Sequence, residues 1–149
     1  MLEFETVSTE EQKNLMISYF RDKPIIITKS GIWYTAKNTK SVFDKHRLFL
    51  IKNRYNGSVI GGIILLDIDF RNSNVRISFE YELTVAYENV PEAILSFFQE
   101  LWSIHKIYWV SKFDTIKQDE NGFYDFEGTI LIESDIFSIF SLQEQKIAR

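Results

Sequence analysis

A strip of polar side chains on one predicted strand holds the residues best suited to acid–base chemistry. Between Val75 and Val85, polar residues alternate with apolar ones, and the polar set comprises Arg76, Ser78, Glu80, Glu82 and Thr84. Because successive side chains of a strand point to opposite faces, this set shares one face of the sheet. Either Glu80 or Glu82 could serve there as a general base. The alternative is that the strip is the solvent-facing side of an antiparallel sheet.

The strip must be positioned by a three-stranded antiparallel meander over residues 48–85. Asn56-Gly57 predicts a first tight turn of type I′, which needs positive φ at both central residues. The polar run at residues 71–74 predicts the second connection. Residues 59–66 are apolar on both faces, which is typical of a strand in the middle of a covered sheet.

Two helices are expected around this meander. Ser8 and Glu11 form a capping-box pattern for a helix over residues 9–22, which ends before Pro24. Asn89 is the expected cap of a second helix over residues 91–105. The apolar face of this second helix comprises Ile94, Phe97, Phe98, Leu101 and Trp102.

Further strands complete the expected sheet. The buried strand at residues 107–110 follows the second helix, so we expect a right-handed crossover that makes it parallel to the third meander strand. The other expected elements are a first strand at 2–7, a short buried segment at 25–27, a loop with a short helix at 41–45, a closing hairpin of 126–132 and 136–142, and a frayed tail at 143–149.

The composition predicts a single domain spanning residues 1–149 and excludes several classes of function. The net charge of −4 is spread along the chain without a basic stripe, which argues against a nucleic-acid partner. The first residues carry acid where a secretory signal needs base, and no apolar run is long enough to span a membrane. We therefore expect a cytoplasmic protein with no membrane contact.

Two segments resemble the GNAT N-acetyltransferases, and most closely the branch that acetylates the N-termini of ribosomal proteins. The first runs from Val59-Ile60-Gly61-Gly62 through Asp67-Ile68-Asp69 to residues 75–79. The second is Asn121-Gly122-Phe123 followed by Phe126-Glu127-Gly128. The resemblance covers about residues 49–142. It implies an α+β fold with a mixed, mostly antiparallel sheet of six or seven strands and helices on both faces.

The resemblance also implies where an acyl donor would bind. The family holds acetyl-CoA between its splayed fourth and fifth strands, which assigns the contacts here to Leu83, Thr84, Val85 and Asn89. Its glycine-rich phosphate loop should fall at residues 86–93, but this stretch holds no glycine, arginine or glutamine. Proline and two glutamates stand there instead. The phosphate loop of acetyl-CoA is thus predicted to be lost.

Side chains for the implied reaction are few. Glu80 or Glu82 would take a proton from the acceptor amine, and Tyr87, Tyr108 or Tyr124 would protonate the leaving thiolate. For each tyrosine, packing in an aromatic-rich core is the simpler explanation. Neither histidine fits a metal or triad spacing, and the two aspartates before residue 71 are interpreted as turn residues. We predict no metal site.

Two functions from different classes remain open. The first is a divergent N-acyltransferase that moves an acyl group from acetyl-CoA, or from another pantetheine thioester on an acyl-carrier protein, to an amine-bearing small molecule or a protein N-terminus. The second is an inactive scaffold, without a cofactor, that binds a protein partner as an inhibitor, immunity factor or assembly component. Either could be a homodimer. The gap between the strands at 75–85 and 106–113 should discriminate them: an open gap favours a thioester, and one plugged by Trp109, Tyr87 or phenylalanine favours the scaffold.

Overall fold

In the part of the chain that the structure describes, seven strands form one sheet in the order β1-β4-β5-β6-β7-β9-β8, and a separate hairpin pairs β2 with β3. The computed structural model describes residues 1–21, 23–29, 31–82, 89–112 and 124–144. In chain order, the elements are β1 (Leu2–Thr6), α1 (Glu10–Phe20), β2 (Ile26–Lys29), β3 (Ile32–Thr35), α2 (Thr39–Lys45), β4 (Arg47–Asn53), β5 (Val59–Asp69), β6 (Asn74–Tyr81), α3 (Val90–Trp102), β7 (Lys106–Lys112), β8 (Asp125–Ile132) and β9 (Asp135–Gln143).

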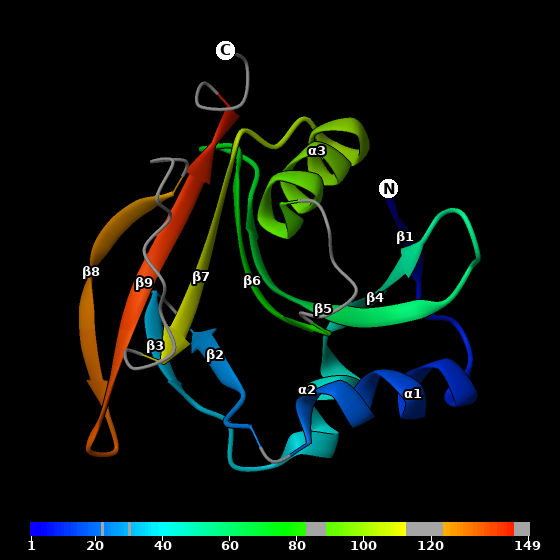
Figure 1. The fold of residues 1–149 in the computed structure, drawn as a ribbon. Coiled ribbons are helices and arrows are strands. Elements are labelled where there is room, and N and C mark those ends of the chain that lie inside the picture. The colour runs from blue at the N-terminus through cyan, green and yellow to red at the C-terminus, as the bar shows by residue number, and fades with distance from the viewer. Residues whose placement is uncertain (22, 30, 83–88, 113–123, 145–149) are drawn as a thin grey trace.

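Helices lie on both faces of the large sheet, as predicted. Helix α3 lies on one face, whereas α1 and α2 lie on the other (Figure 1). Each face has its own apolar core, with Phe49 and Phe98 on the side of α3, and Met16 and Phe43 on the side of α1 and α2. Neighbouring strands are antiparallel except for β6 and β7. The predicted α+β class with a mixed, mostly antiparallel sheet is confirmed.

The predicted meander is formed by β4, β5 and β6. Strand β5 is buried on both faces over residues 60–65, as its apolar run predicts. On β6, Val75 and Ile77 are fully buried against the α3 side, while the alternate residues are only partly buried. The alternation along β6 therefore places its polar strip on the face of α1 and α2.

The connection between β4 and β5 differs from the predicted turn. Only Gly57 has a positive φ, of 72°, whereas a type I′ turn needs two such residues. The loop is longer and closes where Asn53 N–H donates to the Ser58 oxygen and Gly57 N–H donates to the Asn53 oxygen, both at 2.8 Å. The Asn56 side chain accepts from Ser58 N–H at 2.9 Å, which holds the turn without a left-handed asparagine.

The crossover from β6 through α3 to β7 is parallel, as predicted. The two strands pair only over residues 74–76 and 106–108. Beyond those residues, β6 continues to Tyr81 and β7 continues to Lys112 with no pairing between them. The strands thus diverge over their second halves, which leaves part of each backbone edge outside the ladder.

The first helix begins one residue later than predicted. Thr9 is the cap, since its hydroxyl accepts from Gln12 N–H at 3.1 Å and the Gln12 side chain accepts from Thr9 N–H. The predicted pair of Ser8 and Glu11 has the same spacing but is shifted by one position. The helix then ends at Phe20, two residues before the predicted end.

The stretch predicted to be a buried segment and a loop is a β-hairpin. Strands β2 and β3 pair antiparallel, and Gly31 in their turn has a φ of 81°. The hairpin packs through Ile26 and Trp33 against Ile132 and Phe137 of the last two strands. Helix α2 follows at residues 39–45, close to the predicted short helix.

Helix α3 is shorter than predicted, and it buries most of the predicted face, including Ile94 and Phe98. Its C-cap is Ser103, with a φ of 57°, so the chain leaves the helix before His105. Phe98 is fully buried, but Leu101 is 44% exposed, so the prediction that Leu101 covers the sheet is wrong. Leu95, which the predicted face omitted, is fully buried.

The closing hairpin of β8 and β9 is confirmed. Its two-residue turn is Glu133-Ser134, with φ values of 49° and 78°. The predicted frayed tail is partly wrong, because Gln143 pairs with β7 and Glu144 contacts His105, while residues 145–149 lie outside the described part. None of the described helices has the length and apolar character to cross a membrane.

Candidate functional site

Two carboxylates meet the end of α1 where β6 and β7 diverge. The Glu80 carboxylate lies 2.8 Å from the Lys23 ammonium, just beyond the end of α1. The Glu82 carboxylate accepts from the Tyr19 hydroxyl at 3.4 Å. The predicted strip is thus neither a closed cleft nor a bare solvent face. It is a partly covered polar surface between β6 and α1, although its last member, Thr84, lies outside the described residues.

Tyr19 of α1 contacts both β5 and the residue that follows β6. Its hydroxyl also donates to the Val59 carbonyl oxygen at 2.8 Å. Burial, and then the nearby Glu82 carboxylate, raise the pKa of Tyr19 above its ordinary value. Tyr19 therefore stays protonated at neutral pH and serves as a hydrogen-bond donor to Glu82. The sequence pattern showed Tyr19 only as part of the apolar spacing of the first helix.

On the opposite face of the sheet, aromatic rings fill the space between the diverging strands. Trp109 of β7 is only 5% exposed. Its ring lies 5.8 Å from Phe79 of β6, 5.9 Å from Phe140 and 5.2 Å from Tyr124, measured between centroids. On the side of α3 the gap is therefore plugged by Trp109, which is the outcome that the scaffold alternative expects. Tyr87, also named for that alternative, lies outside the described residues.

The N-terminus of α3 is occupied by the protein's own side chains. The Asn89 side-chain oxygen accepts from Glu92 N–H at 3.1 Å and from the Tyr124 hydroxyl at 2.8 Å. Pro91 lies in the first turn and offers no N–H, and Glu92 adds a negative charge. Helix N-termini bind phosphates through free N–H groups and a positive potential. The described residues at this end of α3 therefore do not fit the pyrophosphate of CoA.

Three of the predicted donor contacts, Leu83, Thr84 and Val85, lie outside the described residues and stay predictions. The fourth, Asn89, is engaged in the cap described above. Tyr124, the candidate acid, lies against the same cap and against Trp109. Tyr108 lies on the other face of β7, where the Arg76 guanidinium is 5.3 Å and the Lys106 ammonium 4.7 Å from the centre of its ring. Packing and cation–π contacts account for both tyrosines.

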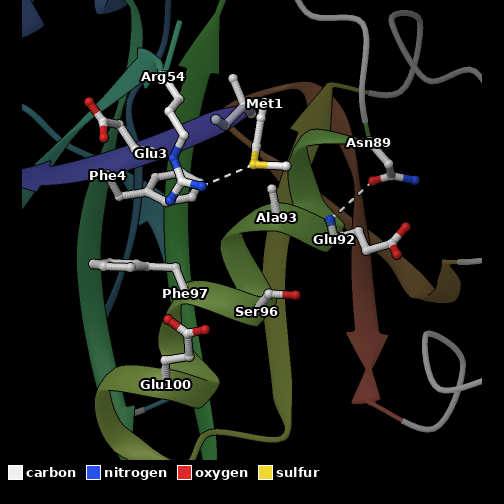
Figure 2. Close-up of a pocket in the computed structure, with 11 residues that line it drawn as sticks. Met1, Glu3, Phe4, Arg54, Asn89, Glu92, Ala93, Ser96, Phe97 and Glu100 are labelled. Carbon is white, nitrogen blue, oxygen red and sulfur yellow. Dashed lines mark hydrogen bonds between the residues drawn. The ribbon is translucent and has the colours of Figure 1, made fainter. Parts of the chain in front are cut away.

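A groove of about 620 Å³ lies between β1 and α3, next to Asn89 (Figure 2). The sequence patterns did not indicate it. Phe4 and Phe97 stack on one side at 4.9 Å between ring centroids. Figure 2 shows the Arg54 side chain reaching the Met1 sulfur, to which it donates at 3.1 Å. The groove adjoins the capped end of α3, so it extends the surface beside the expected donor site.

The two glycines of β5 leave no room for a ligand. A Cβ on Gly61 would stand 2.2 Å from the Glu80 carbonyl oxygen, and one on Gly62 would stand 2.6 Å from the Met16 side chain. Both glycines are therefore explained by close packing within the protein.

The described residues hold no group of three histidine, cysteine or acidic side chains that could bind a metal ion. Asp67 lies 3.4 Å from the Arg76 guanidinium. Asp69 accepts from the Asn72 backbone N–H at 3.1 Å and from its side chain at 2.7 Å. The interpretation of these two aspartates as turn and ion-pair residues agrees with their contacts.

No protein-family model matches this sequence, and no curated protein is similar to it at a significant level. Solved structures resemble it closely in fold. A point mutant of the spermidine N-acetyltransferase of Vibrio cholerae superposes with a TM-score of 0.69 at 10% identity, covering 99% of this chain and 96% of that one. Mutant forms of the spermidine/spermine N-acetyltransferase of the same organism give 0.68 at 12% identity, with the same coverage.

A dodecameric structure of the Vibrio cholerae spermidine N-acetyltransferase gives a TM-score of 0.66 at 12% identity and covers 98% of this chain and 95% of that one. These identities are too low to transfer an activity, a substrate or an assembly. They extend over nearly the whole of both chains, however, so the likeness concerns the complete architecture. The chain has the fold of the GNAT N-acetyltransferases.

Proposed function

We propose that this protein is an N-acyltransferase that moves an acyl group from a pantetheine thioester to an amine. The observation that carries the proposal is the separation of β6 and β7 beyond residues 76 and 108. Backbone N–H and C=O groups beside that separation could pair with the amides of a pantetheine arm. Such pairing needs backbone groups rather than particular side chains.

The acceptor is proposed to approach from the face of α1. Glu80 and Glu82 lie there, at the end of the separated strand, where a protonated amine finds negative charge. Glu80 is the proposed base because its carboxylate already holds an ammonium group at 2.8 Å. The neighbouring folds are named for the acetylation of spermidine, an aliphatic amine. An aliphatic amine is therefore the proposed acceptor class.

The donor is proposed to be held by its pantetheine arm and not by its phosphates. The capped end of α3 disfavours a pyrophosphate, because Glu92 repels it and the Asn89 oxygen already occupies a free N–H. A thioester carried on an acyl-carrier protein removes the need for a pyrophosphate site. Acyl-CoA remains a donor in this proposal, but with weak affinity.

The plug on the α3 side favours a second candidate, a scaffold that binds a protein partner and has no chemistry. Trp109, Phe79 and Tyr124 pack together there, and a thioester arm on that side would have to displace them. The proposed enzyme instead binds the arm along the edges of the strands, toward the polar strip. Trp109 belongs to β7, so an arm bound at the edge of that strand should still change the Trp109 emission, whereas the scaffold should give no response.

The test uses Trp109 as a reporter of binding and thiol release as a reporter of transfer. In a variant with Trp33→Phe and Trp102→Phe, only the Trp109 emission remains, and acetyl-pantetheine should change it. Thiol release from acetyl-CoA, acetyl-pantetheine and an acetylated acyl-carrier protein is then measured with spermidine as the acceptor. Glu80→Gln should slow release by about 100-fold or more, as for the loss of a general base.

Glu5→Gln is the matched control, because Glu5 is also paired with a lysine, Lys52, at 3.0 Å. Glu5 lies on β1, which is three strands away from β6 in the sheet. This control should leave thiol release unchanged. Absence of both the Trp109 response and thiol release with every donor would overturn the enzyme proposal and favour the scaffold. A cytoplasmic location and self-association belong to the same proposal, and light scattering of the purified chain tests the second.

A further inference from the structure

The ammonium group of Lys23 occupies the position in which an acceptor amine would meet the proposed base. Lys23 lies just beyond α1, and its backbone N–H donates to the Phe20 carbonyl oxygen at 3.3 Å. Its side chain crosses to β6 and places Nζ 2.8 Å from Oε1 of Glu80. The Lys23 side chain is 50% exposed and that of Glu80 is 31% exposed. The pair is therefore open to a ligand.

We infer that Lys23 is itself an acyl acceptor, so that the protein acylates its own chain in the presence of a pantetheine thioester. This inference rests on the proposed function and names one substrate of the proposed site. Glu80 lies on the part of β6 that has separated from β7, where the thioester arm is proposed to lie. An amine held by Glu80 is thus close to the proposed acyl group before any external acceptor binds.

The reaction balances with the thioester as the only co-reactant. The Lys23 ammonium gives one proton to Glu80, which passes it to water. The neutral amine attacks the thioester carbonyl carbon, a C–N bond forms and the C–S bond breaks. The second amine proton ends on the departing sulfur, so the products are an amide on Lys23 and a free thiol.

A carboxylate partner is not enough to single out Lys23, because other lysines have one. Lys13 lies 2.8 Å from Asp44, and Lys52 lies 3.0 Å from Glu5. Asp44 belongs to α2 and Glu5 to β1, neither of which borders the separation of β6 and β7. Lys23 differs in that its partner stands at that separation. Lys13 and Lys52 are therefore built-in controls for chemical acylation without a site.

The experiment incubates the full chain with acetyl-pantetheine, and separately with acetyl-CoA, and follows acetyl occupancy at each lysine by peptide mass spectrometry. Lys23 should be acetylated faster than Lys13 and Lys52, by about 100-fold if Glu80 acts as a general base. The rate per molecule should not change with protein concentration, because the reaction is intramolecular. Glu80→Gln should bring Lys23 down to the rate of Lys52, and the melting temperature of this variant checks its folding.

Two results would overturn the inference. One is equal acetylation of Lys23 and Lys52, and the other is an unchanged Lys23 rate in Glu80→Gln. The proposed function is judged separately in the same samples by acetylation of added spermidine. Acetylated spermidine with unmodified Lys23 refutes this inference alone, whereas no thiol release from any donor refutes both.

Discussion

Replacing Gly61 by alanine should strongly destabilise the protein, because the new methyl group would meet the backbone of β6. The Cβ would stand 2.2 Å from the Glu80 oxygen and 2.8 Å from the Tyr81 Cα, whereas ordinary contacts begin at 3.4 Å. To reach ordinary contact, β6 must retreat by roughly 1 Å, which strains a close-packed sheet. Overpacking costs about 1–3 kcal/mol, and each ladder hydrogen bond that is lost adds about 1 kcal/mol. We expect Gly61→Ala to lower the free energy of unfolding by about 3–5 kcal/mol, as measured by urea denaturation.

Gly62 provides the matched control, because its added Cβ would meet a side chain and not the backbone. The obstacle is Met16 of α1, at 2.6 Å. Met16→Ala removes that obstacle, so the pair Gly62→Ala and Met16→Ala should cost less than the sum of the single changes, by about 1–3 kcal/mol. Met16→Ala should not rescue Gly61→Ala. A loss below about 1 kcal/mol for Gly61→Ala, or rescue of that variant by Met16→Ala, would refute the packing described for β5 and β6.

Three further changes test the helix face, a turn and the donor site. Phe98→Ala should lower the free energy of unfolding by about 2–5 kcal/mol, whereas Leu101→Ala should cost much less because Leu101 is 44% exposed; equal losses would contradict the assigned face. The two hydrogen bonds from Asn72 lower the pKa of Asp69 in the folded protein. The ionised carboxylate therefore stabilises the fold when the pH is above the pKa of Asp69 in the unfolded chain, and this stabilisation is lost as the pH falls through the pKa in the folded protein. The free energy of unfolding should therefore be lower for Asp69→Asn than for the wild type at pH 7, and the two values should converge below about pH 4. A difference that stays constant with pH would contradict this. Micromolar acetyl-CoA should leave the melting temperature unchanged, because a ligand adds about 2.7 kcal/mol to the free energy of unfolding only when its concentration reaches about 100 times its Kd. A clear rise in melting temperature would show that cations elsewhere in the protein bind the phosphates.

The sheet could be predicted from the sequence because its strongest patterns are local. Alternation along residues 75–81 and an apolar run at 59–66 specify which faces are buried, and burial sets the register. The helix between β6 and β7 predicts a parallel neighbour because a short turn cannot return the chain in that direction. The same alternation predicts that Glu80 and Glu82 share one face of the sheet.

The predictions were wrong for elements whose local sequence signals are weak or compete with one another. Two adjacent capping patterns at residues 8 and 9 cannot be separated by spacing alone, and in the structure Thr9 is the cap. The hairpin of β2 and β3 is too short to show a period, and it is stabilised by Ile132 and Phe137, which lie about a hundred residues further along the chain. Leu101 fits the helical spacing of a buried face, but it is 44% exposed, whereas Leu95 and Phe98 of the same helix are fully buried.

The candidate site could be predicted only in part, for the same reason. A pattern along one strand reveals the carboxylates of β6, but not the partners that the fold brings to them. Tyr19 in the last turn of α1 and Lys23 just beyond it lie about sixty residues earlier in the chain, and no motif links them to Glu80 or Glu82. Likewise, Asn89 was predicted both as a cap and as a donor contact, and only the contact with Tyr124 shows that its oxygen has two donors already.

Two features of the fold bear on the proposed acyl donor: one favours binding of its pantetheine arm, and the other disfavours binding of a pyrophosphate. The separation of β6 and β7 leaves unpaired backbone edges, and in the proposed function these edges bind the pantetheine arm, whichever side chains the strands carry. The end of α3 depends on side chains, and there Asn89, Pro91 and Glu92 replace the free N–H groups and positive potential that an anion needs. A donor that relies on the arm is compatible with both features, whereas one that relies on a pyrophosphate is compatible with the first alone. If the proposed function holds, we therefore expect a pantetheine thioester carried by a protein to be a better donor than free acetyl-CoA, and thiol release from the two donors, compared at equal concentration, tests this expectation.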